Sequence, residues 1–206
     1  MIKVPILYTY FKMYGDGKLN DTIIVKKEDE VEWSVISDIS ASEYSHLDLL
    51  TLMICYSDNT ATNVMIDLLT MEKINETMKD AGLKDTKIQR KMMDSKARKK
   101  GFDNFTSASD MAHLFEMIYK EKGYMLEILK KQRDNGSLKR FLSEDIVAAH
   151  KTGGLDGINH DMGIFRTDEK PYLLGVFTQG AYNNYETKDF IGAIGKKVYE
   201  EGYKNG

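Results

Sequence analysis

Three small polar residues lie between two strongly apolar runs, and this arrangement constrains the fold more than any other part of the sequence. The runs at 47–54 and 64–69 both have the spacing of buried helices. Ser57, Asp58 and Asn59 are therefore predicted to form a connection that two core helices hold rigid. Capping of the second helix would by itself explain Ser57 or Asp58, whereas rigid connections between packed elements often hold functional side chains. A second motif is needed to decide between these interpretations.

That second motif, His-Lys-Thr-Gly-Gly at 150–154, ends a short apolar run and precedes two strand-like segments. A third lies at the start, because Met1 to Pro5 read as the tail of an SxxK motif whose serine would fall one residue before Met1. The order of Lys3, SDN at 57–59 and KTG at 151–153 resembles the penicillin-recognising serine hydrolases, and the spacings most resemble class A β-lactamases. The resemblance covers nearly all of the chain.

The resemblance implies acyl transfer to a serine, with Lys3, Ser57 and Asn59 as catalytic residues. A serine three residues before Lys3 would lie one helical turn away on the same face, where the Lys3 amine could take its proton. Ser57 would pass a proton to the departing nitrogen, since a hydroxyl both donates and accepts. Asn59 would hold a substrate amide. The like charge of Lys151 would lower the pKa of Lys3 and favour a neutral base near pH 7.

The same resemblance assigns substrate binding to Lys151, Thr152, Gly153 and Gly154. Lys151 and Thr152 would receive the substrate carboxylate along an edge strand, where a ligand can add hydrogen bonds as an extra strand does. Gly153 would keep that approach open. The N–H of Gly154 would form one half of the oxyanion hole, and the N–H of the nucleophile would form the other.

Two departures from the family pattern limit the expected activity. No serine in the 206 residues is followed three positions later by lysine, so the chain reads as a member that starts from an internal methionine or was cut there, and as inactive in this form. The family's deacylating glutamate follows an arginine that Arg90 matches, but in this register Met92 occupies the glutamate position and Lys96 that of the associated asparagine. Asp94 is the only nearby acid; it is either a displaced deacylation acid or a carboxylate that braces the loop. Slow hydrolysis of the acyl-enzyme is expected.

The apolar periodicity predicts an α+β chain in one domain, 1–206, with a mostly helical part over 1–145 and a three-stranded antiparallel sheet and C-terminal helix over 146–206. The resemblance implies a β-lactamase/transpeptidase-like antiparallel sheet flanked by helices that lacks the family's N-terminal helix and two sheet strands. Trp33 is expected to anchor a loop, and 84–107 to form an extended surface loop. The other main expectations are helices at 3–14, 63–69 and 185–203, strands at 22–25, 146–151, 158–165 and 172–179, turns at 156–157 and 168–169, and a capping box that begins at Ser45.

Composition and charge exclude several classes of function. A net charge of −3, with 32 acidic against 29 basic residues, provides no basic surface for nucleic acid, and the lysine-rich stretch 96–100 reads as a solvated turn. The sequence shows no signal peptide and no apolar run of about 18 residues, so no membrane span is predicted, and the compartment stays open. Cys55 has no cysteine partner in the sequence and is expected to be a buried thiol. His160 and Asp161 are interpreted as packed strand residues, so no metal and no cofactor is assigned.

Two hypotheses from different classes remain open. The first is a monomeric β-lactamase-type serine hydrolase domain that acts on β-lactams or D-Ala-D-Ala-like amides. The second is a non-catalytic domain of the same fold that binds a peptidoglycan-type peptide or a protein partner through the cleft.

Overall fold

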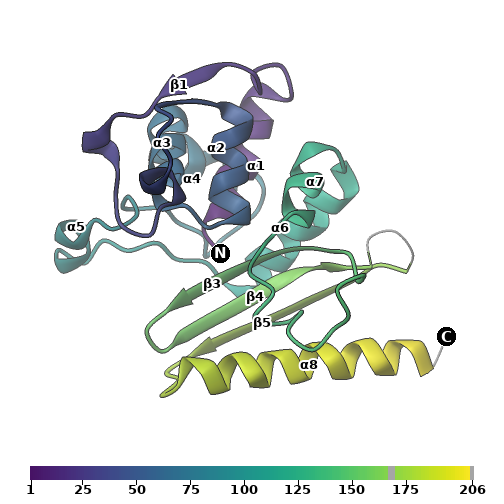
Figure 1. The fold of residues 1–206 in the computed structure, drawn as a ribbon. Helices are drawn as coiled ribbons and strands as arrows, with labels where there is room; N and C mark the ends of the chain where they lie inside the picture. Colours follow the sequence, from purple (N-terminus) through teal and green to yellow (C-terminus); the bar gives the residue numbers. More distant parts are fainter. Residues whose placement is uncertain (167–169, 205–206) are drawn as a thin grey trace.

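The computed structural model describes residues 1–166 and 170–204, and its architecture has the predicted α+β class (Figure 1). Two short strands, β1 (Thr22–Ile24) and β2 (Glu43–Ser45), pair in antiparallel fashion, and the short 3-10 helices η1 (Lys27–Asp29) and η2 (Val35–Asp38) lie between them in the sequence. The helices that precede the main sheet are α1 (Lys3–Tyr14), α2 (His46–Cys55), α3 (Asn59–Leu69), α4 (Met71–Asp80), α5 (Ser95–Lys99), α6 (Ala108–Glu121) and α7 (Tyr124–Lys130).

Helix α1 is the central element of the helical part. It packs against α2, α3, α4 and α7, and its residues from Lys3 to Tyr10 are all buried. A helix of this kind is stable only when other elements surround it. Its start lies inside the core, so even the side chain of Lys3 in the first turn is buried. The buried apolar residues of α1 are Val4, Ile6, Leu7, Tyr8 and Tyr10.

The main sheet is an antiparallel meander in the order β3 (Ala148–Leu155), β4 (Ile158–Phe165) and β5 (Tyr172–Gln179). Helix α8 (Asn184–Lys204) covers one face, and α6 packs against β4 and β5 on the other (Figure 1). Gly195 permits the close approach of α8, because an added Cβ would lie 2.2 Å from the carbonyl oxygen of Leu138. The register places Thr152 of β3 opposite Asp161 of β4. Strand β3 also contacts α7.

The positions of most elements agree with the sequence predictions. Helix α1 and strands β4 and β5 have the predicted bounds, and the capping box is present, with the Asp48 N–H donating to Ser45 Oγ at 3.0 Å. Strand β3 begins at Ala148 rather than at 146 and continues through the KTG motif. The loop at 84–107 contains one short helix, α5, and a bridge between Lys87 and Phe105. The expected turn at 168–169 lies outside the described residues.

The prediction for Trp33 was wrong. Its side chain is 80 % exposed, whereas Ile36, three residues later, is 2 % exposed and fixes this loop to the core. A smaller aliphatic side chain therefore does the anchoring that the sequence argument assigned to the tryptophan.

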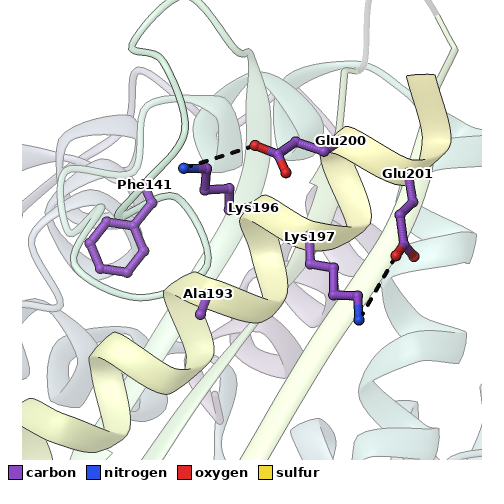
Figure 2. Close-up of a pocket in the computed structure, with 6 residues that line it drawn as sticks. All are labelled: Phe141, Ala193, Lys196, Lys197, Glu200 and Glu201. Atoms are coloured by element: carbon purple, nitrogen blue, oxygen red, sulfur yellow. Dashed lines mark ion pairs between the residues drawn. The ribbon is translucent and has the colours of Figure 1, made fainter. Parts of the chain in front are cut away.

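A surface hollow on α8 lies apart from the sequence motifs (Figure 2). Phe141 and Ala193 form its apolar part, and the ion pairs Lys196–Glu200 and Lys197–Glu201, both at 3.9 Å, form its polar part. Within residues 1–166 and 170–204, no helix combines the length and apolarity that a membrane crossing requires.

Candidate active site

The connection between α2 and α3 buries Asp58 and leaves Ser57 and Asn59 on either side of it. One Asp58 oxygen accepts the Ala61 N–H at 2.8 Å and caps α3, and the other accepts the Ile36 N–H at 2.9 Å. The fully buried carboxylate thus fixes both the helix and the neighbouring loop. Ser57 has φ 57°, a left-handed conformation that a non-glycine residue keeps only when its surroundings impose it. Asp58 therefore caps α3, and the side chains of Ser57 and Asn59 are not needed for capping.

Lys3 reaches this connection from the first turn of α1. Its Nζ donates to Asn59 Oδ1 at 2.9 Å and to the carbonyl oxygen of Ser57. Burial lowers the pKa of Lys3 to about 7, and the positive charge of Lys151 is the second cause. From the sequence, only the charge of Lys151 was expected to lower this pKa, whereas burial is the larger cause. A large fraction of Lys3 is thus neutral near pH 7, as a proton acceptor must be.

Lys151 approaches Ser57 from the opposite side, on β3. Its Nζ donates to Ser57 Oγ at 2.6 Å and to the carbonyl oxygen of Thr152 at 3.0 Å. Burial lowers the pKa of Lys151 to about 8, although nearby carboxylates raise it. One lysine therefore binds the carbonyl of Ser57 and the other binds its hydroxyl oxygen, which leaves the hydroxyl hydrogen available for donation.

The rest of the KTG strand lies beside these four side chains. Thr152 is buried, and its side chain lies near the carboxylate of Asp134. Gly153 lies against Met1, which precedes α1. An added Cβ at position 153 would lie 2.7 Å from the Met1 backbone nitrogen. Gly154 is exposed on the same strand. The structure thus brings Lys3, Ser57, Asn59 and Lys151 into one hydrogen-bonded group, with Thr152 to Gly154 adjoining it.

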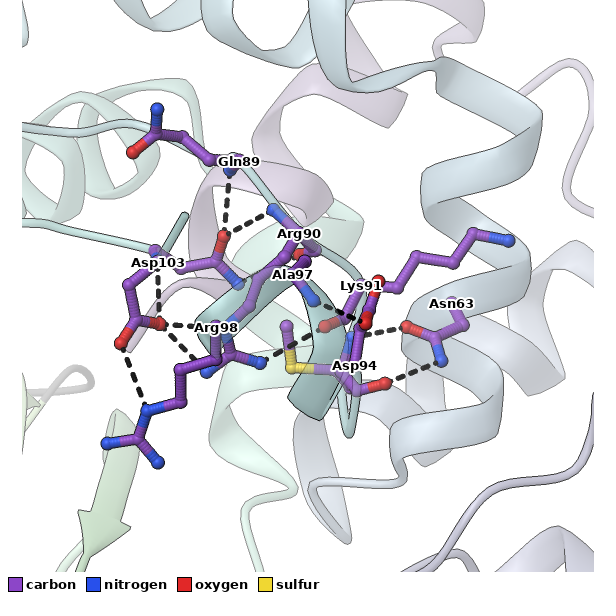
Figure 3. Close-up of polar contacts among 10 residues, drawn as sticks. Asn63, Gln89, Arg90, Lys91, Asp94, Ala97, Arg98 and Asp103 are labelled. Carbon is purple, nitrogen blue, oxygen red and sulfur yellow. Dashed lines mark hydrogen bonds and ion pairs between the residues drawn. The ribbon is translucent and has the colours of Figure 1, made fainter. Parts of the chain in front are cut away.

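An ion-pair and amide network braces the long loop (Figure 3). The Arg90 guanidinium pairs with Asp103 at 2.8 Å, and Arg98 contacts the same carboxylate at 3.5 Å. Asn104 Oδ1 accepts the backbone N–H groups of Gln89 and Arg90 at 2.9 and 3.1 Å. These contacts join the two ends of the loop and fix the segment between them.

Asn63 holds Met92 at the loop position where the resemblance expects a glutamate (Figure 3). Its amide accepts the Met92 N–H at 2.7 Å and donates to the Met92 carbonyl oxygen at 3.1 Å. The Met92 side chain is half-buried against the core. Asp94 caps α5 by accepting the Ala97 N–H at 2.9 Å, and Lys96 is exposed on that helix. Met92 therefore contributes a thioether, which is not a base, at this loop position.

Two residues near the motifs, Glu32 and Trp33, were not assigned to the site from the sequence. The carbonyl oxygen of Trp33 accepts the Asn59 N–H at 3.3 Å, and that of Glu32 accepts the Asn59 side-chain amide at 3.1 Å. Trp33 has φ 61° and an exposed ring, so it is an aromatic surface beside the SDN motif. Its only sequence signal is that it is the single tryptophan in the chain.

Comparison with known proteins decides the family. A model of the β-lactamase enzyme family matches residues 1–201. The chain belongs to the β-lactamase enzyme family. It is a β-lactamase-type serine hydrolase domain by fold and sequence, and no curated protein matches it significantly.

Solved structures of this family superpose on nearly the whole chain. A β-lactamase from Sphaerobacter thermophilus is 25 % identical, with a TM-score of 0.85, and the match covers 97 % of this chain and 81 % of that one. A variant of PBP-A, solved as an acyl-enzyme complex with penicillin G, is 27 % identical, with a TM-score of 0.85, over 98 % of this chain and 80 % of that one. The TLA-1 extended-spectrum β-lactamase, 20 % identical over 96 % of this chain and 81 % of that one, shares the fold with a TM-score of 0.85.

The His160–Asp161 pair does not form a site. Asp161 pairs with His150 at 3.0 Å, whereas His160 stacks on Phe177 with ring centroids 4.3 Å apart. Adjacent strand residues point to opposite faces of the sheet, which separates the two side chains. In the part of the chain that the structure describes, no group of three or more His, Cys, Asp or Glu side chains is arranged to hold a metal.

Proposed function

We propose that this domain binds anionic acyl donors, β-lactams or D-Ala-D-Ala-like amides, and transfers the acyl group to a serine that directly precedes Met1. The main support is the position of Ser57 between two buried lysines, since Lys3 Nζ binds its carbonyl oxygen and Lys151 Nζ lies 2.6 Å from its Oγ. Lys3 is the neutral base, and Lys151 is the cation that receives the substrate carboxylate.

The proposed acylation begins when the serine oxygen attacks the substrate carbonyl carbon and the serine proton moves to Lys3 Nζ. The C–N bond then breaks, and the nitrogen takes the hydroxyl proton of Ser57. Lys3 then returns the serine proton to Ser57, so that one proton moves in net from the serine to the nitrogen. Lys151, whose Nζ lies 2.6 Å from Ser57 Oγ, keeps its proton and its charge.

Hydrolysis of the acyl-enzyme is slow in this proposal. Met92 occupies the loop position of the expected base, and Asp94 is engaged as the cap of α5. The domain would therefore resemble a penicillin-binding protein that stays acylated more than an enzyme that destroys penicillin rapidly.

A binding domain without chemistry is the second candidate. The observation that favours it is the absence from all 206 residues of a serine followed three positions later by lysine. Under this alternative the 206-residue chain keeps the anion site at Lys151 but forms no covalent bond.

Ligand-induced thermal stabilisation tests the placement of the site under both candidates. Penicillin G or a D-Ala-D-Ala peptide should raise the Tm of the 206-residue chain, because a ligand that binds only the folded state stabilises it. Lys151→Ala should abolish this rise, whereas Lys96→Ala, a matched change at an exposed lysine on α5, should preserve it. Equal shifts in the wild type and in Lys151→Ala would contradict the proposed site.

A further inference from the structure

The end of α2 is held by a segment that lies far away in the sequence. A helix leaves its last four carbonyl groups without partners inside the helix, so other groups must bind them. The carbonyl oxygen of Ile54 accepts the side-chain amide of Gln132 at 3.0 Å, and that of Cys55 accepts the Arg133 N–H at 3.2 Å. These carbonyls come three and two residues before Ser57. The segment after α7 therefore fixes the helix end that leads into this serine.

Gln132 joins α2 to the turn in which Gln132 itself lies. Its side chain is buried, and its Oε1 accepts the backbone N–H groups of Arg133 and Asp134 at 2.9 and 3.0 Å. Its Nε2 donates to Ile54 on α2. An amide can accept and donate in this way, whereas a carboxylate could only accept and an apolar side chain could do neither.

The same segment is bound to the main sheet at its other end. Asn135 Oδ1 lies 3.2 Å from Nε2 of His150, the residue directly before Lys151. His150 Nδ1 pairs with Asp161 at 3.0 Å, and the second oxygen of that carboxylate accepts the Leu138 N–H at 2.9 Å. His150 and Asp161 are almost completely buried, where hydrogen bonds are stronger than in water. The segment is thus fixed to β3 and β4 as well as to α2.

Helix α8 closes the segment from the outside. An added Cβ on Gly195 would lie 2.2 Å from the carbonyl oxygen of Leu138, so the backbone of α8 rests directly on the backbone of the segment. Ser137 and Leu138 are both buried at this contact. The segment therefore cannot move outward unless α8 moves with it.

We propose that residues 132–138, the brace segment, set the separation between Ser57 and Lys151, with Gln132 and His150 as positioning residues. Ser57 Oγ and Lys151 Nζ lie 2.6 Å apart but belong to different elements, the end of α2 and β3. The brace segment binds each element within three residues of the reacting side chain. The inference rests on the proposed function for the meaning of this spacing, whereas the spacing itself is a property of the unliganded protein.

Ligand-free crystal structures of two variants test the proposal without reference to catalysis. Gln132→Met keeps the approximate volume of the side chain but neither donates to Ile54 nor accepts from the turn, and Gln132→Glu keeps only the accepting oxygen. In both variants the distance from Ser57 Oγ to Lys151 Nζ should increase beyond about 3.5 Å, where a hydrogen bond is lost.

Asn75→Leu is the matched control, because it removes an amide with the same two roles elsewhere. Asn75 lies on α4, and its side chain donates to the Ile88 carbonyl oxygen and accepts the Ile88 N–H, both at 2.8 Å. This variant should have a lower Tm and an unchanged distance between Ser57 and Lys151.

Acylation kinetics provide a second readout, in a chain extended upstream so that a serine directly precedes Met1. Gln132→Met should lower the acylation rate at saturating penicillin G by about 10- to 100-fold, since a displacement of about 1 Å has effects of this size. Asn75→Leu should be acylated at the rate of the extended parent. A purely structural role for Gln132 would lower the Tm in both variants without this difference in rate.

An unchanged distance between Ser57 and Lys151 in Gln132→Met, or an equal increase in Asn75→Leu, would overturn the proposal. Gln132→Glu decides in the same way if Gln132→Met does not fold. Failure of penicillin G to acylate the extended parent would count against the proposed function, whereas the distances in the ligand-free structures would still test this inference.

Discussion

The two sides of the site differ in what their buried polar groups do. On the motif side, Lys3 and Lys151 place two titrating amines on one serine, and both have pKa values shifted into the neutral range. On the loop side, the polar groups of Arg90, Asp103 and Asn63 are all engaged in holding the backbone. The first side holds the groups to which we assign proton transfer, and the second side makes the loop rigid.

This difference separates the two halves of the proposed reaction. Acylation uses only groups on the motif side, whereas deacylation needs a base on the loop side, where Met92 lies. The four predictions below break or sharpen this separation, in order of decreasing expected effect, and the kinetic ones use a chain extended upstream so that serine directly precedes Met1.

The largest effect is expected from Lys3→Met in the extended chain. Loss of a positioned base typically slows a reaction about 10²–10⁴-fold, and acylation by penicillin G should slow by this factor. Stopped-flow or quench measurements of adduct formation provide the rate. Lys12→Met, at the exposed end of the same helix, is the matched control and should acylate normally. Normal acylation of the Lys3→Met variant would show that Lys3 on the motif side is not the base.

Met92→Glu should introduce the missing base on the loop side. The acyl-enzyme should then decay at least about 10²-fold faster than in the extended parent, since general-base catalysis has this scale. Met92→Gln is the control, because glutamine has the size of glutamate but is not a base. The acyl-enzyme of this variant should decay slowly. Slower decay in Asp94→Asn than in the parent would show instead that Asp94 activates water, contrary to its capping role.

Asn63→Ala should destabilise the fold through the loop. The change removes the partners of the Met92 N–H and carbonyl, and an unsatisfied buried polar group costs about 1–3 kcal/mol. Urea unfolding should show a loss of about 2 kcal/mol. Asn20→Ala, at an exposed asparagine, should change stability by less than about 0.5 kcal/mol. A neutral Asn63→Ala would mean that the loop is not held from α3.

Between pH 7 and pH 9, the motif side should make the stability of the fold depend on pH, and the loop side should not. The folded pKa of Lys3, about 7, lies below the ordinary lysine value of 10.5, so between these limits the unfolded chain binds more protons and the free energy of unfolding rises with pH. Lys3 should contribute up to about 1.4 kcal/mol per pH unit in this window, a share that Lys3→Met removes. Unfolding measured at pH 7, 8 and 9 gives the slope. Asp103→Asn should leave it unchanged, and an equal slope in Lys3→Met would show that Lys3 titrates normally.

The elements that carry the motif side were predicted well because their signals are local. The periodicity of α1 and the capping box at Ser45 each involve residues within a few positions of one another. The turn at 156–157 also sets the hairpin register, so the pairing of Thr152 with Asp161 was within reach of the sequence.

The parts that escaped prediction depend on long-range packing. Asp134 lies in a stretch without periodicity, and only the fold brings it to Thr152. Trp33 was expected to anchor a loop, whereas its backbone carbonyl contacts Asn59 and its ring faces solvent. Asn63 looked like an ordinary helix residue, since its contact with Met92 joins positions 29 residues apart.

Intact-mass spectrometry after incubation with penicillin G tests the central claim most directly. The 206-residue chain should keep its mass, and the extended chain should gain one adduct that peptide mapping places on the added serine and that persists for a long time. Ser57→Ala in the extended chain should slow the adduct's formation without relocating it, because Ser57 transfers a proton and is not the nucleophile. An adduct on the 206-residue chain, at Ser57 or elsewhere, or no adduct on a folded extended chain, would contradict the account.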